Sequence, residues 1–323
     1  MKQKTVSSKK VLAVIAKQKA AIAVIFMLAA MIFIPSSFYS RHNLLNLLRD
    51  SSVMLIISFG VTLTIVAGGC DLSVGGNMCL SGIVAIMMIN SGMSIPLAVI
   101  LTVLLGAVIG LFNGFLAVHQ KTEAFIITLG TGMLFKGLCE LLTDAHPISC
   151  AGSQFMQFAN GKLFGVIYNI VIWMLFLGIG VYALLRFTGF GRNLYAIGGD
   201  YSVAVYSGIK VVKTKWLAFI LCGAMTAFAG VLLSSRMNTG SAIYGDSTAL
   251  MVNCGCVVGG TSFAGGRGGI VQTVVGMFVL TILQNAMNVL GLPAYVQQLS
   301  QGIIIVMILW SDSYGRKRQR EAV

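Results

Sequence analysis

Charged side chains are scarce in this 323-residue chain, and acidic ones are the scarcest. Only 10% of the residues are charged and nine are acidic, whereas soluble domains carry roughly 25% charged residues. Hydrophobic residues make up 57% of the chain, and the mean hydropathy is +0.90. This composition excludes a water-soluble globular domain and predicts an integral membrane protein.

Residues for catalysis or ATP hydrolysis are also missing from the sequence. It has no Walker A pattern, and none of its three histidines pairs with a plausible nucleophile. Most of the seven cysteines lie in apolar runs, where a free cysteine behaves as a small hydrophobe. Cys254 and Cys256 lack the second pair that a zinc site needs. We therefore expect no catalytic residue, metal site, disulfide framework or bound cofactor in this chain.

Long apolar runs fill most of the sequence. The ten runs lie near residues 20–38, 52–68, 74–91, 95–118, 124–143, 166–185, 216–234, 250–264, 269–290 and 296–312. About 20 apolar residues cross a bilayer as a helix, and a β-barrel would not give such unbroken runs. The predicted fold is an all-α polytopic membrane protein of about ten transmembrane helices, some of them broken by glycine-rich segments.

The formal net charge of +13 is unevenly distributed. Six lysines precede the first apolar run, five basic residues lie between 186 and 215, and four follow the last run. Because basic loops stay on the cytoplasmic side, both termini and the loop at about 186–215 are predicted to be cytoplasmic. The charge therefore indicates topology rather than nucleic-acid binding. The expected organisation is a basic tail (1–19), a single membrane domain (20–312) and a second basic tail (313–323).

Two glycine-rich segments, GCDLSVGG and VVGGTSFAGGRGG, interrupt the apolar runs. They and the residues beside them supply candidate elements of a translocation path: Asp71, Ser73, Gly75, Asn77, Gly259, Gly260, Thr261 and Ser262. Broken backbone at membrane depth is tolerated only where it is buried in protein or lines a cavity. Two interpretations of Asp71 stay open. With Ser73 it can cap the helix that starts near Val74, or it can contact a permeating solute.

Other polar residues lie in or beside the apolar runs. Asn285 and Asn288 are expected either to join helices or chains by hydrogen bonds, typically contributing ~1 kcal/mol each, or to line the path. Lys136 is expected to snorkel or to pair with Glu140 one turn away. The segment RHNLLNLLRDSS (41–52) predicts a short amphipathic helix at the outer membrane interface.

The basic loop carries a short helix signal. Asp200 is placed as an N-cap, and Gly208 is placed to end the helix after Ser207. A short cytoplasmic helix between spans serves either as a docking element or as a spacer.

Taken in order, the motifs resemble those of the membrane permease subunits of bacterial ABC importers for monosaccharides. That family includes ribose, xylose, arabinose and galactose permeases and the related autoinducer-2 permeases. The motifs are GCDLSVGG, TEAFIITLGT (122–131), GFGRNLYAIGG with SGI (189–209), AGVLLSSRMNTGS (229–241), VVGGTSFAGGRGG (257–269) and NAMNVLGLPAYVQQLSQGIII (285–305). Their ordered combination covers most of the chain from about residue 45 to residue 311.

The resemblance implies a type II importer-like fold in the bacterial cytoplasmic (inner) membrane. It implies a homodimer or heterodimer of permeases, two cytoplasmic ATP-binding subunits that hold ATP and Mg²⁺, and an extracytoplasmic sugar-binding protein. The chain itself would be a transport subunit rather than an enzyme, surrounded by membrane lipids. The segment 198–209 matches the family's coupling helix, which gives the residues expected to couple to the ATPase: Gly198, Gly199, Asp200, Ala204, Ser207 and Gly208.

Two segments depart from the family pattern. The coupling segment is usually rich in glutamate, alanine and arginine, but here it carries Tyr201, Val203, Val205 and Tyr206. The segment TALMVNCGC (248–256) stands where the family commonly has acidic residues. Two alternatives therefore stay open. An autonomous secondary transporter or channel would work as this chain alone, with flux sensitive to Asp71. A non-transporting membrane scaffold would give no flux even with partners present.

Overall fold

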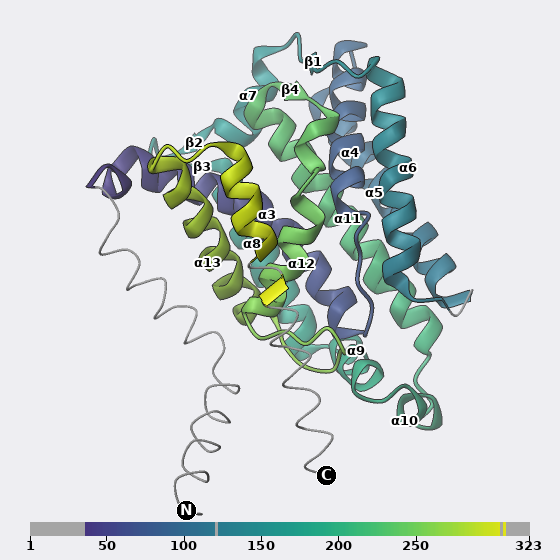
Figure 1. The fold of residues 1–323 in the computed structure, drawn as a ribbon. Helices are drawn as coiled ribbons and strands as arrows, with labels where there is room; N and C mark the ends of the chain where they lie inside the picture. Colours follow the sequence, from purple (N-terminus) through teal and green to yellow (C-terminus); the bar gives the residue numbers. More distant parts are fainter. Residues whose placement is uncertain (1–35, 120–121, 304–305, 308–323) are drawn as a thin grey trace, which may run out of the picture.

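The computed structural model (Figure 1) describes residues 36–119, 122–303 and 306–307, and most of them are helical. The helices are η1 (Ser36–Tyr39), α3 (Arg41–Val66), α4 (Val74–Asn90), α5 (Ile95–His119), α6 (Ala124–Thr143), α7 (Ser153–Asn160), α8 (Asn169–Phe187), α9 (Gly189–Gly199), α10 (Tyr201–Tyr206), α11 (Val211–Met237), η2 (Ala242–Gly245), α12 (Thr248–Val258) and α13 (Ile270–Val289). A further helix covers residues 294–303. Two antiparallel pairs of very short strands complete the elements: β1 (Ile148–Ser149) with β4 (Thr239–Gly240), and β2 (Lys162–Leu163) with β3 (Ile167–Tyr168).

Six helices of the described part of the chain are long and apolar enough to cross a membrane: α3, α5, α6, α8, α11 and α13. Two further apolar helices, α4 and α12, are shorter. The prediction of an all-α polytopic membrane protein is therefore confirmed. Four parts of the predicted organisation lie outside the described residues: the tails at 1–19 and 313–323, most of the run at 20–38 and the end of the run at 296–312.

Helices α3 and α11 form the centre of the molecule. Most of their residues are buried, whereas α5, α6 and α8 leave large apolar side chains exposed, as suits a lipid-facing surface. Helix α11 packs against α3, α4 and α5. A methyl group on Gly223 of α11 would lie 2.2 Å from the carbonyl oxygen of Gly106 on α5. Such close approach is what small residues allow between membrane helices.

Two expectations need correction. Residues 41–52 form no separate interfacial helix, because they are the first turns of the continuous helix α3 and Leu47 is buried in it. Nothing between Arg41 and Val66 breaks the helix, and Ser40 caps its start by accepting a bond from the amide of Asn43. Lys136 forms its ion pair with Asp246, which follows η2, rather than with Glu140 on its own helix.

Candidate functional site

The first glycine-rich segment is a backbone break (residues 67–73) between α3 and α4. Asp71 in this break is only 1% exposed. Its Oδ1 accepts hydrogen bonds from the backbone amide (2.9 Å) and the hydroxyl (2.7 Å) of Ser73. The side chain of Asn113, on α5, donates to the same hydroxyl at 2.7 Å. The carboxylate therefore holds the turn that leads into α4, much as the capping interpretation expects, although Ser73 itself makes no side-chain cap bond.

Side chains from two more helices satisfy the backbone of this first break. The amide of Leu72 donates to the hydroxyl of Thr128 on α6 at 2.9 Å. The side-chain amide of Asn253, on α12, donates to the carbonyl oxygen of Asp71 at 2.9 Å. The break is thus buried in protein with its polar groups paired, as broken backbone at membrane depth requires.

The second break, residues 259–269, lies between α12 and α13. The hydroxyl of Tyr195, on α9, donates to the carbonyl oxygen of Gly268 at 2.8 Å. Burial raises the pKa of Tyr195 above its ordinary value, and that ordinary value already keeps the hydroxyl protonated at neutral pH. Within the break, Ser262 accepts from the amide of Ala264 at 3.3 Å. Thr261 is 1% exposed, and its hydroxyl finds no hydrogen-bond partner among the residues that the structure describes.

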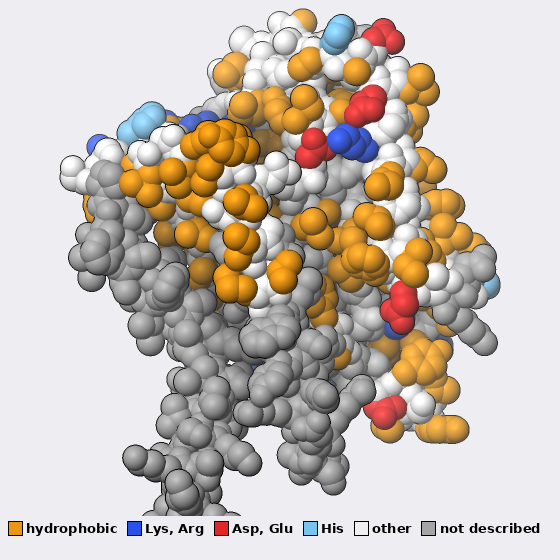
Figure 2. Space-filling view, in the orientation of Figure 1, with side chains coloured by type: hydrophobic (Ala, Val, Ile, Leu, Met, Phe, Trp, Pro, Cys, Tyr) orange, Lys and Arg blue, Asp and Glu red, His pale blue; other side chains and the backbone are white. Residues whose placement is uncertain are grey.

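Helices α9 and α10 form the loop that carries the predicted coupling segment. Asp200 caps α10 by accepting from the amide of Val203 at 3.0 Å, and Gly208 follows the helix with a φ of +75°. Both sequence predictions about this helix are confirmed. Ala204 is buried beside Ile197 and Val211. The other side of α10 is exposed and apolar, and Figure 2 shows hydrophobic side chains gathered over it.

The two breaks and the coupling loop meet where glycine backbones lie against one another. We call this contact the glycine junction; it consists of Gly68, Gly198, Gly199, Gly265 and Gly266. A methyl group on Gly198 would lie 1.9 Å from the carbonyl oxygen of Val66 and 2.4 Å from the amide nitrogen of Gly266. That amide donates to the same Val66 carbonyl at 3.0 Å. The backbones thus touch with no side chain between them.

Glycines 265 and 266 complete the junction from the side of the second break. A methyl group on Gly265 would lie 2.8 Å from the Cα of Gly198 and 2.9 Å from the Cα of Gly68. Gly265 and Gly266 have φ values of +87° and +70°, which favour glycine because a side chain is strained there. Gly198, predicted for coupling, therefore lies against both the end of α3, where the first break begins, and the second break. Gly199, also predicted for coupling, lies against Gly266 of the second break.

The remaining predicted residues lie apart from the junction. Asn77 donates to the carbonyl oxygen of Gly223 at 3.1 Å, which ties α4 to α11. The side-chain amides of Asn285 and Asn43 pair at 2.8 Å and 3.1 Å, joining α13 to the start of α3. Asn288 accepts from Gln297 at 2.8 Å. These contacts match the expected helix-joining role of polar residues in spans.

Gly75, Gly259 and Gly260 lie at close backbone approaches or turns. A methyl group on Gly75 would lie 2.5 Å from the carbonyl oxygen of Gly245, and one on Gly259 would lie 1.7 Å from that of Gln272. Gly260 has a φ of +111°. They shape the elements around the breaks and carry no side chain of their own.

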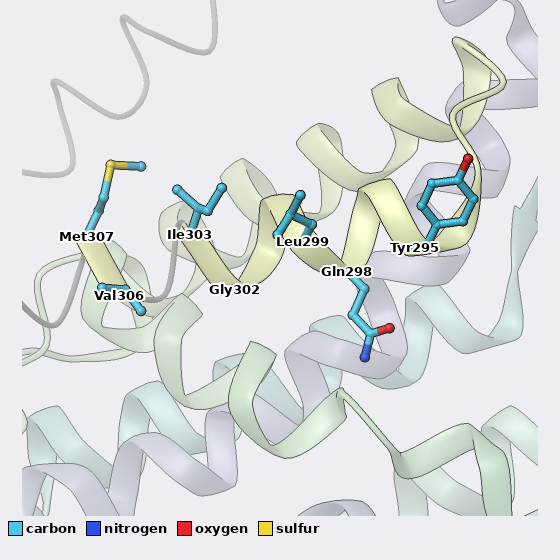
Figure 3. A pocket seen from close by; sticks show the side chains of 7 residues that line it. All are labelled: Tyr295, Gln298, Leu299, Gly302, Ile303, Val306 and Met307. Atoms are coloured by element: carbon cyan, nitrogen blue, oxygen red, sulfur yellow. The ribbon is translucent and has the colours of Figure 1, made fainter.

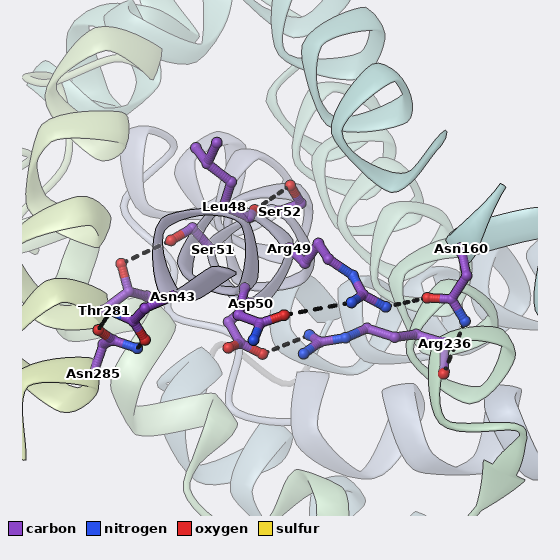
Figure 4. Close-up of polar contacts among 11 residues, drawn as sticks. Asn43, Leu48, Arg49, Asp50, Ser51, Ser52, Asn160, Arg236, Thr281 and Asn285 are labelled. Carbon is purple, nitrogen blue, oxygen red and sulfur yellow. Dashed lines mark hydrogen bonds and ion pairs between the residues drawn. The ribbon is translucent and has the colours of Figure 1, made fainter. Parts of the chain in front are cut away.

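A polar cluster at the start of α3 was not anticipated from the sequence (Figure 4). Arg49 bonds to Asn160 of α7, and its guanidinium lies over the ring of Tyr168, 4.4 Å from the centroid. Arg236 at the end of α11 pairs with Asp50. These contacts join residues more than 100 positions apart in the sequence, so no local spacing pattern predicts them.

A groove of about 630 Å³ runs along the last described helix (Figure 3). It is lined mainly by apolar side chains, with Tyr295 at one end and Met307 at the other. Leu299 and Ile303 are more than half exposed along it. The surface is therefore apolar and open, and it suits lipid or another membrane helix.

The family profile described as "Branched-chain amino acid transport system / permease component" matches residues 43–309. The chain belongs to this family. It is 38% identical to the ribose import permease protein RbsC of Bacillus subtilis over 85% of this chain and 86% of that protein. It is 33% identical to the ribose import permease protein RbsC of Haemophilus influenzae, over 92% and 93%. It is 30% identical to the xylose transport system permease protein XylH of Escherichia coli, over 87% of each.

Family membership decides between the broad classes of function. The chain is a permease component, a multi-pass membrane protein that takes part in transport and is not an enzyme. The resemblance to importer permeases that the ordered motifs indicated is confirmed.

Proposed function

We propose that this chain is the membrane-spanning permease subunit of an ATP-driven importer that moves a monosaccharide into a bacterial cell. The observation that carries the proposal is the likeness, over more than four-fifths of the chain, to permeases named for ribose and xylose. The family description names branched-chain amino acids, but these relatives are named for sugars. A test of the substrate therefore has to compare a sugar with a zwitterionic amino acid.

The proposed arrangement has about ten membrane helices and both termini in the cytoplasm. The α10 end of the molecule would face the cytoplasm, because five basic residues lie in the 186–215 loop there. The assembly would contain a second permease chain, two ATP-binding subunits that hold ATP and Mg²⁺, and an extracytoplasmic sugar-binding protein. The broken segments with Asp71, Ser73, Gly259 and Thr261 would line or flank the path.

The coupling mechanism follows from the glycine junction. An ATP-binding subunit that moves α10 would also move α9, since α10 follows α9 directly and Ala204 packs against Ile197. At Gly198 the backbone of α9 contacts the end of α3, where the first break begins, and the second break. Movement of α9 would therefore displace both segments directly. In this account, closure of the ATP-binding subunits shifts the breaks and changes which side of the path is open.

The exposed surface of α10 is the proposed docking site for the ATP-binding subunit. Tyr206 is 90% exposed and Val203 is 61% exposed. In place of the usual charges, apolar side chains would fill a groove on the partner. Such burial contributes roughly 25 cal/mol per Å² of apolar surface.

The autonomous transporter gains no support from the geometry of Asp71. Its carboxylate is buried and already accepts two hydrogen bonds from Ser73. A proton or solute pathway through this residue would have to displace both bonds.

Affinity purification from native membranes tests the proposal. The tagged chain should recover an ATPase with a Walker A motif, and its activity should rise with a ribose- or xylose-loaded binding protein. Stimulation by a leucine-loaded binding protein instead would replace the sugar with an amino acid. Recovery of the chain alone in several mild detergents would contradict the importer assignment.

A matched pair of variants tests the docking surface. Tyr206→Ala should abolish co-purification of the ATPase while leaving the permease itself stable, because the side chain is 90% exposed. Phe164→Ala is the control, since Phe164 is 91% exposed in the β2–β3 turn. Equal ATPase recovery with both variants would show that α10 is not the docking element.

A further inference from the structure

The ion pair between Lys136 and Asp246 occupies an unusual place for two charges. Lys136 lies inside α6, seven residues before its end at Thr143, or roughly 10 Å along the helix axis. The side chains of Lys136 and Asp246 are 42% and 49% exposed. Exposed apolar side chains lie near both residues, with Met133 and Ile243 each 69% exposed, and Glu140 is exposed one turn from Lys136.

Charged side chains within a membrane span almost always face the bundle interior or a water-filled cavity. This pair faces the surface of a single chain, so in the assembly that surface should border water rather than lipid. A cavity shared with a second permease chain meets this requirement.

Backbone contacts place the pair directly beside the first break. Asp246 follows Gly245, whose added methyl group would lie 2.4 Å from the carbonyl oxygen of Gly75 at the start of α4. Lys136 lies one turn beyond Gly132 on α6. A methyl group on Gly132 would lie 3.1 Å from the carbonyl oxygen of Leu72 in the break. A shift of the break would therefore displace the helices that hold both charges.

We propose that Lys136 and Asp246 form a polar contact site for the sugar in the translocation path, an inference that rests on the proposed function. The Asp246 carboxylate accepts hydrogen bonds from sugar hydroxyls, and the Lys136 ammonium donates to hydroxyl oxygens. Because the pair is neutral overall, it suits an uncharged polyol. Movement of the breaks would alter the spacing of the two groups and release the sugar.

The test uses proteoliposomes that hold the permease with its co-purified ATPase and binding protein. It measures uptake of radiolabelled D-ribose and ATP hydrolysis together. Asp246→Asn and Lys136→Met should each lower ribose uptake per ATP about 10-fold, which corresponds to ~1.4 kcal/mol. Stimulation of the ATPase by loaded binding protein should persist, because neither residue lies in the docking surface. Glu140→Gln, one turn away on the same exposed side of α6, is the matched control and should leave uptake per ATP unchanged.

Any of three results would overturn the inference. One is wild-type uptake per ATP in both single variants. Another is full recovery in the double variant Lys136→Met/Asp246→Leu, whose apolar side chains can still pack α6 against η2 but offer a sugar no polar group. This result would show that the pair only joins α6 to η2. If a neutral variant fails to assemble, Asp246→Glu keeps the charge but moves the carboxylate, and it should still lower uptake per ATP; normal uptake by it would contradict the inference. Absence of both ribose and xylose uptake by the wild-type complex would instead contradict the proposed function.

Discussion

At its start, helix α3 contacts neighbouring helices through side chains. At its end, it contacts its neighbours through the backbone. At the beginning, Ser51 bonds to Thr281 at 3.0 Å, Asn43 pairs with Asn285, and Asp50 pairs with Arg236. At the end, Val66 and Gly68 lie directly against the backbones of α9 and the second break.

The two kinds of contact differ in how they respond to change. A side-chain hydrogen bond can lose a partner or adjust its length, and its net contribution is only ~1 kcal/mol. A glycine backbone contact leaves no room for a single carbon, and neither backbone can move aside without moving its helix. The start of α3 should therefore tolerate substitution, whereas Gly198, the most tightly packed position of the glycine junction, should not.

The largest effect is expected from Gly198→Ala. Its new methyl group would lie 1.9 Å from the carbonyl oxygen of Val66, a backbone atom. Overpacking of this kind typically costs ~1–3 kcal/mol and occasionally more, so we expect the high end of that range and loss of uptake. Thermal unfolding in detergent and ribose uptake measure the two effects.

Gly199→Ala is the neighbouring control. A methyl group there meets no atom within 4 Å, and alanine is favoured over glycine in a helix by up to ~1 kcal/mol. Stability should be unchanged or slightly increased. If Gly198→Ala behaves like this control, the junction is not the tight contact described.

The next effect is expected from Asp71→Ala in the first break. Two donors of Ser73 would lose their buried acceptor, and each unsatisfied group costs ~1–3 kcal/mol. Both bonds go to the same oxygen, Oδ1. Asp71→Asn keeps that acceptor, so it should lose much less stability than Asp71→Ala by thermal unfolding. An alanine variant as stable as wild type would contradict the structural role of the carboxylate.

A smaller effect is expected from Tyr195→Phe, which removes the hydrogen bond from α9 to Gly268. The expected loss is ~1 kcal/mol of stability, with uptake reduced but present because the glycine contacts remain. Uptake per ATP, compared with wild type, measures how much this hydrogen bond contributes to coupling in addition to the glycine junction. A complete loss of uptake would mean that the tyrosine, not the junction, carries the coupling.

The smallest effect is expected at the start of α3. Asp50→Asn removes the charge from a pair whose acidic partner is 54% exposed, and exposed pairs contribute ~0–1 kcal/mol. Stability and uptake should stay close to wild type. A loss as large as that of Gly198→Ala would remove the distinction between the two ends of α3.

The sequence predicted the features that depend on neighbouring residues. Apolar runs gave the membrane helices, and Asp200 and Gly208 gave α10, because caps and periodicity act within a few positions. The glycine-rich breaks were also visible, since glycine clusters interrupt helical runs.

Contacts between distant positions could not be predicted in the same way. Lys136 is 110 positions from Asp246, so the nearer Glu140 was the only partner that local spacing offered. The glycine junction joins three segments of the chain. A glycine in the sequence indicates flexibility or close approach, but it does not predict which other segment comes close. The continuous start of α3 was missed because an amphipathic pattern does not say whether a helix lies on the membrane or continues into it.

The most direct test of the central claim is a set of spin-label distances with and without trapped ATP. Labels at Ser202→Cys on α10, Ala264→Cys in the second break and Gln154→Cys on α7 occupy exposed positions outside the apolar docking surface, whereas the seven native cysteines are buried or half-buried. Dilution with unlabelled chain restricts the distances to one permease. Coupling through the glycine junction predicts that the distance from 202 to 264 stays constant while the distance from 264 to 154 changes. A change in the first distance with none in the second would show that α10 moves without the break, which would contradict coupling through the glycine junction.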